Sequence, residues 1–295
     1  MRNTEDAIKK AEVLLEAIPY IRSFSGDVVV VKYGGSAMTD EKLKHSVTTD
    51  IAMLKYLGLK PVIVHGGGKE ISSMLKRLGK ESVFIDGLRV TDKETAAIAE
   101  MILSGSIAKS LVEDLESVGI SACSINGKDG HTIEAVKKID EKGRDLGFVG
   151  EIEKVNTLLI STLIEKGFVP VISPVGVDEK GQTYNINADY AASAIAGALD
   201  AKKLIFLTDV DGVLKDVNTP SSIITRMSQA EANKYIEDGT ISGGMIPKVE
   251  CCLDAINRGV KSVHVLNGTL MHSILLEIFT SEGIGTMVTK ESDND

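Results

Sequence analysis

The chain has 295 residues, 43% of them hydrophobic and 25% charged, so it can form one large domain or two lobes with an ample buried core. Its net charge of −9 and its pI of about 5.2 argue against a nucleic-acid interface, which needs a basic face. Three cysteines, two of them adjacent, give neither a disulfide framework nor zinc-ligand spacing. Because we find no signal peptide and no run of 18 apolar residues, we expect a cytoplasmic protein without a membrane partner.

The first predicted element is an amphipathic helix at the N-terminus. Ile8, Ala11, Leu15 and Ile18 recur at helical spacing, and charged residues occupy most positions between them. This helix precedes the first strand of the core, and a sheet sandwich offers its apolar stripe no obvious place. We therefore expect residues 1–25 to form an oligomerisation helix whose stripe packs on another subunit rather than on its own chain.

A strand, a lysine and two glycines come next. Residues 28–31 are four valines, typical of a strand buried on both faces of a parallel sheet, and Lys32 lies at the exit of this strand. A buried ammonium group is costly unless it meets an anion. Gly34 and Gly35 let a ligand approach the backbone N–H groups. A helix that begins near Asp40 adds the electric field of its N-terminus, which favours an anion. The segment predicts a phosphate site; the alternative is a lysine at a sheet edge beside a plain turn.

The same order of strand, glycines and helix occurs again. Residues 60–65 predict a second buried strand that ends in Gly66, Gly67 and Gly68, and a helix is expected over residues 70–78. Both glycine clusters follow the carboxyl end of a strand, which is where ligands bind in open α/β sheets. Further strands are expected at residues 120–125, 168–173, 203–208, 260–266 and 285–289.

Strands and helices alternate over nearly the whole chain, which is typical of right-handed βαβ units. We predict an α/β fold, a three-layer αβα sandwich with a mainly parallel central sheet in two lobes, residues 26–200 and 201–295. Residues 126–155 are an exception, because their short alternating runs predict hairpins that protrude from the sheet and could serve as a lid.

Several common catalytic motifs are absent. The sequence contains no GxxxxGK[ST], GxGxxG, HExxH or GxSxG and no His-Arg-Asp loop. Lys32, Lys248 and Asp189 remain, each at a strand end or a helix start. Phosphoryl transfer needs little more, because fixed cations lower the energy of the negative charge on the migrating group. A carboxylate can orient two lysines or bind magnesium.

Six segments resemble motifs of the amino-acid kinase family, and they occur in the family's order between about residues 26 and 290. In detail they resemble the branch that phosphorylates the side-chain carboxylate of N-acetyl-L-glutamate with ATP in arginine biosynthesis. Any one motif alone would be a weak signal. The segments are VVKYGG at 30–35, VHGGG at 64–68, GLRVT at 87–91, NINADYAA at 185–192, LTDVDG at 207–212 and GGMIPK at 243–248.

The resemblance implies a role for each matching residue. Lys32 and Lys248 match the two lysines that stabilise the transition state, and Asp189 matches the aspartate that orients them. Arg89 would form a bidentate pair with a substrate carboxylate. The remaining substrate-binding positions would be Gly67, Gly68 and Asn185.

The resemblance also implies a nucleotide site and a cofactor. Gly34 and Gly35 would donate N–H groups to the phosphoryl group in transit. Mg²⁺ would be held chiefly by the phosphates of ATP, so no residue is assigned as a metal ligand. The other ATP-binding positions would be Thr208, Asp209, Val210, Asp211, Gly212, Val213, Leu214, Thr240, Ile241, Ser242 and Gly243.

Each of these residues also has a purely structural interpretation. Arg89 alone would be a solvated surface charge. Asp189 alone would be the N-cap of the following helix, and Asn185 alone would be part of a turn.

The N-terminal helix resembles the extension of family members that arginine inhibits, in which such helices interlace dimers into a hexamer. We therefore expect a homo-oligomer with a dimeric core, assembled as a hexamer, with L-arginine as an effector. Tyr20, Lys203, His264, Glu277 and Gly285 match that effector site, and Glu277 would pair with the guanidinium. The alternatives are a solvated charge at Glu277 and a satisfied strand histidine at His264.

Other functions stay open on the sequence alone. A sibling kinase of lysine biosynthesis acts on an amino acid linked to a carrier protein, and an assay with free N-acetylglutamate separates the two. Carbamate, aspartate and uridylate kinases fit less well, because Arg89 and Asp189 lie in motifs that favour the acetylglutamate branch. A non-catalytic sensor of arginine or nucleotide is a third class, against which the intact Lys32, Asp189 and Lys248 argue.

Overall fold

The computed structural model describes residues 17–140, 142–216, 219–280 and 283–291 together with Ile8 and Leu15. Its central sheet contains strands from the whole length of the chain. Its strands are β1 (Val28–Tyr33), β2 (Lys60–His65), β5 (Ala122–Asn126), β8 (Val169–Ser173), β11 (Lys203–Thr208), β12 (Arg226–Ser228), β13 (Ser262–Asn267) and β14 (Thr286–Thr289). Their order is β12-β14-β13-β11-β1-β2-β8-β5. All neighbours from β5 to β13 are parallel, and β14 is antiparallel to β13. The predicted mainly parallel sheet is confirmed.

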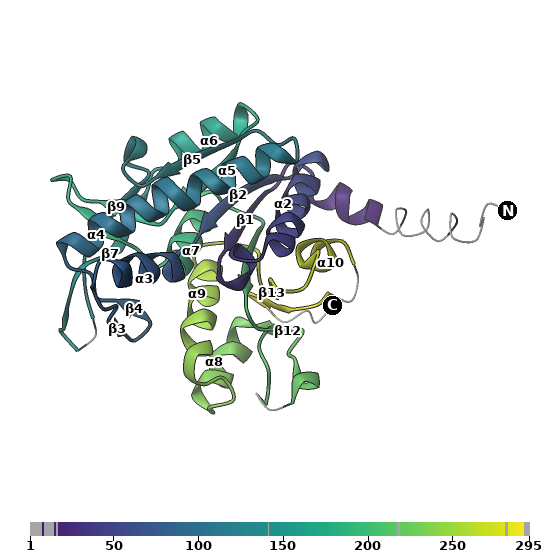
Figure 1. Cartoon of the computed structure of the whole chain (residues 1–295). Coiled ribbons are helices and arrows are strands. Elements are labelled where there is room, and N and C mark those ends of the chain that lie inside the picture. The colour runs from purple at the N-terminus through teal and green to yellow at the C-terminus, as the bar shows by residue number, and fades with distance from the viewer. Residues whose placement is uncertain are drawn as a thin grey trace.

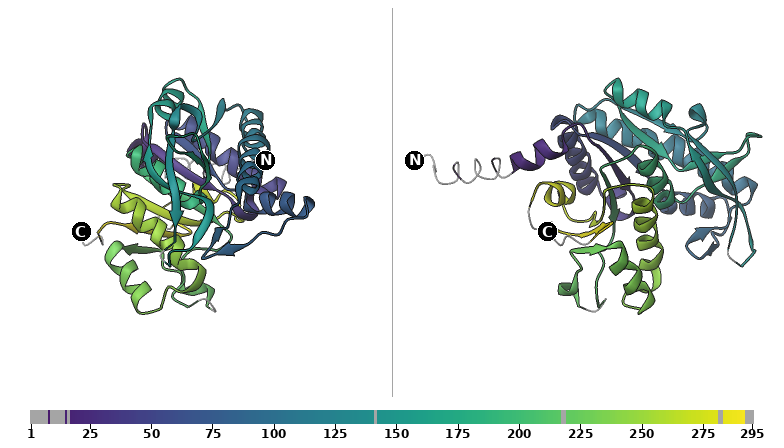
Figure 2. Two further views of the ribbon diagram at one scale, coloured as in Figure 1. Left: turned by 90° about the vertical axis from the view of Figure 1, so that its left-hand side faces the viewer. Right: turned by 180° about the vertical axis from the view of Figure 1, so that it is seen from behind.

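Helices cover both faces of this sheet (Figures 1 and 2). One face carries α6 (Leu158–Glu165), α7 (Ala188–Ala198), α8 (Gln229–Glu237) and α9 (Ile246–Asn257). The other carries α2 (Glu41–Tyr56), α3 (Gly68–Arg77), α4 (Lys93–Glu100), the π-helical turn η2 (Met101–Ile107), α5 (Ala108–Ser117) and α10 (Ser273–Phe279). Side chains alternate along β1, so that Val30 joins the first core whereas Val29 and Val31 join the second. The three-layer sandwich follows from this double burial.

Helix α2 shows why the first turn after β1 is well defined. The Asp40 carboxylate accepts hydrogen bonds from the backbone N–H groups of Lys42 (2.9 Å) and Leu43 (3.0 Å), so it caps the helix at its predicted start. Between β1 and α2 lies only the short 3₁₀ helix η1 (Gly35–Met38). The two glycines are therefore held between a fully paired strand and a capped helix.

Residues 126–155 form part of a small closed barrel. Strands β6 (Ile133–Ile139) and β7 (Asp145–Val155) pair as the expected hairpin. They do not protrude alone, because β9 (Val175–Val177) and β10 (Thr183–Asn185) close the barrel in the order β10-β7-β6-β9. The sequence predicts no strand where β10 lies. Its pairing with β7 places Asn185 beside Val149.

The N-terminal helix can be followed only in part. Residues 17–24 are helical, and Tyr20, Ile21 and Phe24 pack on the second core of their own chain. Ile8, Leu15 and Ile18 are exposed. Most of the predicted oligomerisation helix, residues 1–25, lies outside the described residues. Packing of its stripe on another subunit stays a prediction, although its C-terminal end packs on its own sheet.

One helical stretch, Lys93–Ser117, is long and apolar enough to cross a membrane by length and composition alone. It comprises α4, η2 and α5. Leu103, Ile107 and Leu111 pack in the second core, and the core helix of a globular domain meets the same criterion. Burial against the sheet accounts for its composition.

Candidate active site

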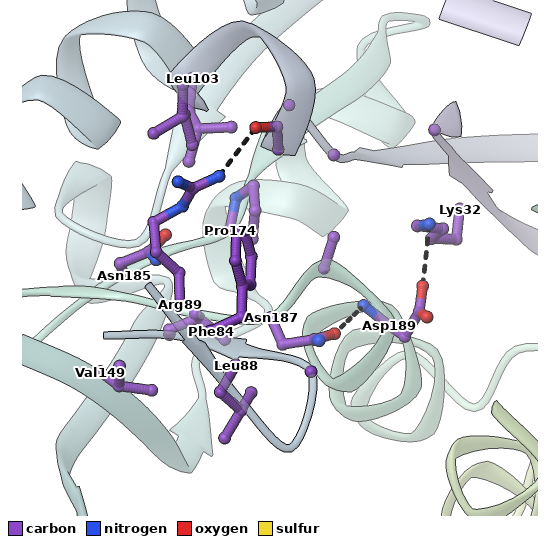
Figure 3. Close-up of a pocket in the computed structure, with 18 of the residues that line it drawn as sticks. Lys32, Phe84, Leu88, Arg89, Leu103, Val149, Pro174, Asn185, Asn187 and Asp189 are labelled. Carbon is purple, nitrogen blue, oxygen red and sulfur yellow. Dashed lines mark hydrogen bonds and ion pairs between the residues drawn. The ribbon is translucent and has the colours of Figure 1, made fainter. Parts of the chain in front are cut away.

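A cavity of about 230 Å³ lies at the carboxyl ends of β1, β2 and β8. After β1 the chain places β2 on one side and much later β11 on the other, so the strand order reverses at β1, next to this cavity. Such a crossover point is where α/β sheets bind ligands. The predicted residues Lys32, Gly34, Gly35, Gly67, Gly68, Arg89, Asn185 and Asp189 all line the cavity, together with Gly66, Ile71, Phe84, Gly87, Leu88, Leu103, Val149, Pro174, Ile186, Asn187 and Ala188 (Figure 3).

Two lysines far apart in the sequence meet one carboxylate. Lys32 lies near the end of β1 and Lys248 in the first turn of α9, and their Nζ atoms lie 2.9 Å and 3.6 Å from Oδ1 and Oδ2 of Asp189. Asp189 itself lies in the first turn of α7. Figure 3 shows the pair of Lys32 and Asp189 at the edge of the cavity. The structure therefore brings the three residues together, although Lys248 does not line the cavity itself.

The charge state of Asp189 is set by its neighbours. Burial alone would raise its pKa, but the charges of Lys32 and Lys248 outweigh burial and hold the pKa below its ordinary value. An ionised Asp189 cannot donate a proton, but it can keep two ammonium groups at fixed positions. Two lysines and one carboxylate leave one net positive charge beside the cavity.

Arg89 is a buried guanidinium that lines the cavity away from Lys32 (Figure 3). Its Nη1 donates to Ser82 Oγ (2.6 Å), its Nη2 donates to Gly68 O (2.8 Å) and Ser72 Oγ (2.9 Å), and its plane lies over the Phe84 ring at 4.6 Å. Burial lowers its pKa, yet guanidinium stays charged at neutral pH. No carboxylate among the described residues pairs with it. A solvated surface charge is therefore excluded, and Arg89 is an oriented cation at the cavity wall with no carboxylate partner among the described residues.

The glycine turn after β2 fits against the π-helical turn η2. Gly67 precedes the first residue of α3, whose early N–H groups lack helical partners and favour an anion. A Cβ on Gly67 would lie 2.8 Å from Leu103 Cδ2 and closer still to Ile107 Cδ1. Any other residue at this position would force the side chains of Leu103 and Ile107 to shift.

Asn187, which the sequence analysis did not assign, is the N-cap of α7. Its Oδ1 accepts a hydrogen bond from the backbone N–H of Asp189 (2.8 Å). The capping interpretation of Asp189 is therefore wrong, and its carboxylate is left for the two lysines. Asn185 donates weakly to Thr91 Oγ1 (3.4 Å) and otherwise faces the cavity.

The turns after β1 and β11 touch each other. Ser36 N donates to Asp209 Oδ1 (2.8 Å), and a Cβ on Gly35 would meet that oxygen at 2.6 Å. Asp211 accepts from Asn267 Nδ2 (2.7 Å), so the end of β13 fixes the same turn.

The remaining predicted nucleotide residues lie outside the cavity. Thr208 Oγ1 donates to Val210 O (2.9 Å) and lies 3.2 Å from Leu266 O, and the Thr286 hydroxyl accepts from Val213 N (2.8 Å). Thr240, Ile241, Ser242 and Gly243 form the loop just before α9. The described geometry therefore joins Asp209 to the Gly34–Gly35 turn, while the roles of residues 208–214 and 240–243 stay predictions.

No group of three or more His, Cys, Asp or Glu side chains within the described residues is close enough to hold a metal ion. The arrangement offers cations and backbone N–H groups to an anion, rather than oxygen ligands to a metal.

A second buried charged cluster lies at the amino end of β11 and β13. Glu277 Oε1 bonds His264 Nδ1 (2.7 Å), and His264 Nε2 lies 3.1 Å from Lys203 Nζ. Lys203 also lies over the Phe24 ring at 4.7 Å. The structure thus brings Lys203, His264 and Glu277 together beside the helix that carries Tyr20. A role of this cluster as an effector site stays a prediction.

Glu277 is held more firmly than a surface charge would be. Its Oε2 accepts from the backbone N–H groups of Ile284 (2.8 Å) and Gly285 (3.1 Å). Burial raises its pKa, but the bonds to His264 and to these N–H groups outweigh burial and lower it. Burial also lowers the pKa of Lys203 to about 8, although Glu277 opposes that shift. The interpretation of Glu277 as a solvated charge is therefore wrong.

His65 is fully buried at the end of β2 and was not singled out from the sequence. Burial lowers its pKa from 6.5 to about 4. The unfolded chain therefore binds a proton between pH 6.5 and 4 that the folded chain does not, so the free energy of unfolding should fall as the pH drops through this window. We expect His65 to lower the free energy of unfolding by on the order of 3 kcal/mol across this window, since each pKa unit is worth about 1.4 kcal/mol. Urea unfolding at pH 7 and pH 4.5 of wild type and His65→Gln measures it. A variant with the same pH slope as wild type would contradict the assignment.

The chain was compared with known proteins. The amino acid kinase family model matches residues 27–267. Acetylglutamate kinase from Caldanaerobacter subterraneus is 54% identical over 290 residues, which are 98% of this chain and 96% of that protein. Acetylglutamate kinase from Methanocaldococcus jannaschii is 51% identical over 294 residues, 97% of this chain and 98% of that protein.

Solved structures are also similar. N-acetylglutamate synthase from Neisseria gonorrhoeae, complexed with coenzyme A and N-acetyl-glutamate, superposes with a TM-score of 0.85 at 27% identity. The match covers 96% of this chain but only 64% of the synthase chain. The same synthase complexed with coenzyme A and L-arginine gives a TM-score of 0.80 at 26% identity, over 96% of this chain and 66% of that one.

Proposed function

Because this chain belongs to the amino acid kinase family, we propose that it transfers the γ-phosphoryl group of ATP to the side-chain carboxylate of N-acetyl-L-glutamate, a step of arginine biosynthesis. The observation that carries the proposal is the meeting of Lys32 and Lys248 at Asp189, beside a cavity that the buried guanidinium of Arg89 lines. The two acetylglutamate kinases described above, which are about half identical to this chain over nearly its whole length, support the proposal.

The cavity suits a substrate with two carboxylates. Arg89 takes the α-carboxylate as a bidentate partner once that carboxylate displaces Ser72 or Gly68 from Nη2, which donates to both in this structure. This leaves the side-chain carboxylate directed toward Lys32 (Figure 3). Asn185 and the N–H groups of Gly67 and Gly68 are polar partners for the remaining amide and carboxylate oxygens. A substrate bound in this way has its reacting oxygen next to the Gly34–Gly35 turn.

The reaction needs no proton transfer. An oxygen of the side-chain carboxylate forms a bond to the γ-phosphorus of ATP, the bond from that phosphorus to the β,γ-bridging oxygen breaks, and ADP leaves with the electron pair. The products are ADP and an acyl phosphate. Lys32 and Lys248 stabilise the charge that spreads over the phosphoryl oxygens, and Asp189 keeps the two ammonium groups in place.

In this proposal the phosphates of ATP would hold the Mg²⁺ ion. When bound, the ion neutralises part of the phosphate charge. The Gly34–Gly35 turn and Asp209 then orient the triphosphate end.

A coupled assay of ADP release tests the function. Purified protein with ATP and Mg²⁺ should release ADP only when free N-acetylglutamate is added, and hydroxylamine should trap the acyl phosphate as a hydroxamate. Glutamate without the acetyl group is the matched control. Release that requires a carrier-linked substrate would indicate the sibling kinase instead, and binding of ATP without any turnover would indicate a sensor.

We propose in addition that L-arginine inhibits this enzyme at the cluster of Lys203, His264 and Glu277. Glu277 is a planar acceptor for a guanidinium, and the similar synthase was solved with L-arginine. Gly285, just before the last strand, donates its backbone N–H to Glu277, and Tyr20 lies on the helix whose Phe24 ring contacts Lys203. A hexamer built through the N-terminal helices couples the sites, because Tyr20 lies on the helix that would cross between dimers.

Arginine should therefore lower the activity. In Glu277→Gln the affinity for arginine should fall at least about tenfold, because the neutral amide loses a charged hydrogen bond worth roughly 1.5–3 kcal/mol. Activity titrated with arginine, lysine and citrulline measures this, and lysine is the control for charge without a planar head group. Light scattering measures the assembly. Activity that millimolar arginine leaves unchanged would contradict the effector site, and a mass corresponding to a dimer would contradict the hexamer.

A further inference from the structure

Three buried groups from different elements form a chain of hydrogen bonds beneath the glycine turn. His65 Nδ1 lies 2.8 Å from Gly66 O, and His65 Nε2 lies 2.9 Å from Ser173 Oγ. Ser173 Oγ in turn lies 3.2 Å from Leu103 O. His65 and Ser173 are both fully buried. The chain joins the ends of β2 and β8 to the π-helical turn η2.

The donors in this chain can be assigned by counting protons. Gly66 O can only accept, so the neutral His65 ring carries its proton on Nδ1. Its Nε2 then accepts from the Ser173 hydroxyl. Since that hydroxyl has a single proton, it serves either His65 or Leu103 O at any moment. The bond from His65 to the carbonyl of Gly66 is therefore the permanent one, and Ser173 keeps the ring in the orientation that makes it.

The π-helical turn contacts the same glycines from the other side. Leu103 O accepts from the backbone N–H of Ala108, five residues later, which is the spacing of a π-turn. The side chains of Leu103 and Ile107 contact Gly67, and Leu103 also lines the cavity. Gly66 N donates to Tyr33 O (2.8 Å), which ties the turn to β1. The peptide of Gly66 thus has little freedom to rotate as long as His65 holds its carbonyl.

We propose that His65, held by Ser173, is a positioning residue for the amino-acid end of the site. It fixes the Gly66 carbonyl, and this fixes the direction in which the N–H groups of Gly67 and Gly68 face the cavity. This inference rests on the proposed function. It predicts a defect in the binding of N-acetylglutamate and not of ATP, because the proposed nucleotide site around Asp209 lies on the other side of β1.

The test separates the two bonds of the ring. His65→Leu removes both, whereas His65→Asn keeps an amide N–H near the place of Nδ1 and loses the contact with Ser173. We expect His65→Leu to raise the KM for N-acetylglutamate about tenfold, the effect of one buried hydrogen bond, with kcat and the KM for ATP within about threefold of wild type. His65→Asn should recover most of the loss. His45→Asn, on the exposed side of α2, is the control.

Ser173→Ala provides a second variant in case His65→Leu does not fold, and it should raise the same KM about threefold. Equal changes in the KM of both substrates would overturn the positioning role. So would a His65→Asn variant whose KM for N-acetylglutamate is no closer to wild type than that of His65→Ala. A lowered melting temperature with unchanged KM values would reduce the network to a structural one. Wild type that is inactive with N-acetylglutamate would instead overturn the proposed function, so the two failures are distinguishable.

Discussion

Replacement of Lys32 by alanine should lower kcat about 100- to 1,000-fold, and Lys248→Ala should have an effect of the same size. This is the typical loss for one preorganised group that stabilises charge in a transition state. Both ammonium groups lie within 4 Å of Asp189, so each is fixed before substrate arrives and needs no reorganisation. The coupled ADP assay at saturating ATP and N-acetylglutamate measures kcat. The KM values should change much less, because the charge on the phosphoryl oxygens is redistributed mainly in the transition state.

Controls decide whether the loss is catalytic. Lys60→Ala removes an exposed lysine at the start of the neighbouring strand, at the far end of the sheet, and should leave kcat unchanged. Lys32→Arg keeps a charge but changes its shape, so it should recover only part of the activity. Melting temperatures of all variants are needed, because Lys32→Ala leaves Asp189 with one partner. If both alanine variants retained kcat within about threefold, the phosphoryl-transfer role of the pair would be wrong.

Asp189 allows the two lysines to be tested as a unit. Its conversion to asparagine leaves two ammonium groups close together without the carboxylate that separates them, so they should move apart by repulsion. We expect turnover to fall more than ATP affinity, which isothermal titration of the inactive variant with ATP measures. The loss in a triple variant should be smaller than the sum of the single losses if the three residues act together.

The strand ends were predictable because the chemistry there is local. Four valines followed by a lysine and two glycines require a buried strand and a turn, whatever the rest of the chain does. The same holds for Asp40, whose cap on α2 depends on the next three residues. The meeting of Lys32 with Lys248 is not local, however. The spacing within each segment gave no distance between them, and only the resemblance of six ordered motifs to one family suggested that they converge.

Other features of the site depend on pairings that no short segment encodes. Asn187 rather than Asp189 caps α7, because both are capable of capping and only the two lysines decide between them. β10 contains only three residues, and its partners β7 and β9 make it a strand. Asn267 is not predicted as a site residue, yet its amide donates a hydrogen bond to Asp211. In each of these cases the deciding contact comes from a residue remote in the sequence or from a competition between neighbours.

Arg89→Leu should raise the KM for N-acetylglutamate by at least about 30-fold. Next to the loss of kcat in the lysine variants, this is the largest effect that we expect. Loss of one partner of a buried, hydrogen-bonded charge pair costs roughly 2–5 kcal/mol, much of it from the carboxylate that is then left without a partner. The KM for ATP should stay within about threefold, since Arg89 and the Lys32–Asp189 pair line separate parts of the cavity (Figure 3). Initial rates with each substrate varied in turn measure both constants.

The design of this test must separate the charge of Arg89 from its structural bonds. Ser82→Ala removes the hydrogen bond to Nη1 but leaves the guanidinium in place, so its KM should rise only a few-fold. Arg89→Lys keeps the charge and loses the planar fork, and it should lie closer to leucine than to wild type because one ammonium cannot replace two parallel N–H donors. The same question can be tested by changing the substrate instead of Arg89. The α-amide of N-acetylglutamate, which lacks that carboxylate charge, should be a poor substrate of wild type and should lose little further in Arg89→Leu. Should the amide lose as much as the acid in that variant, Arg89 would be shaping the cavity and not binding the carboxylate.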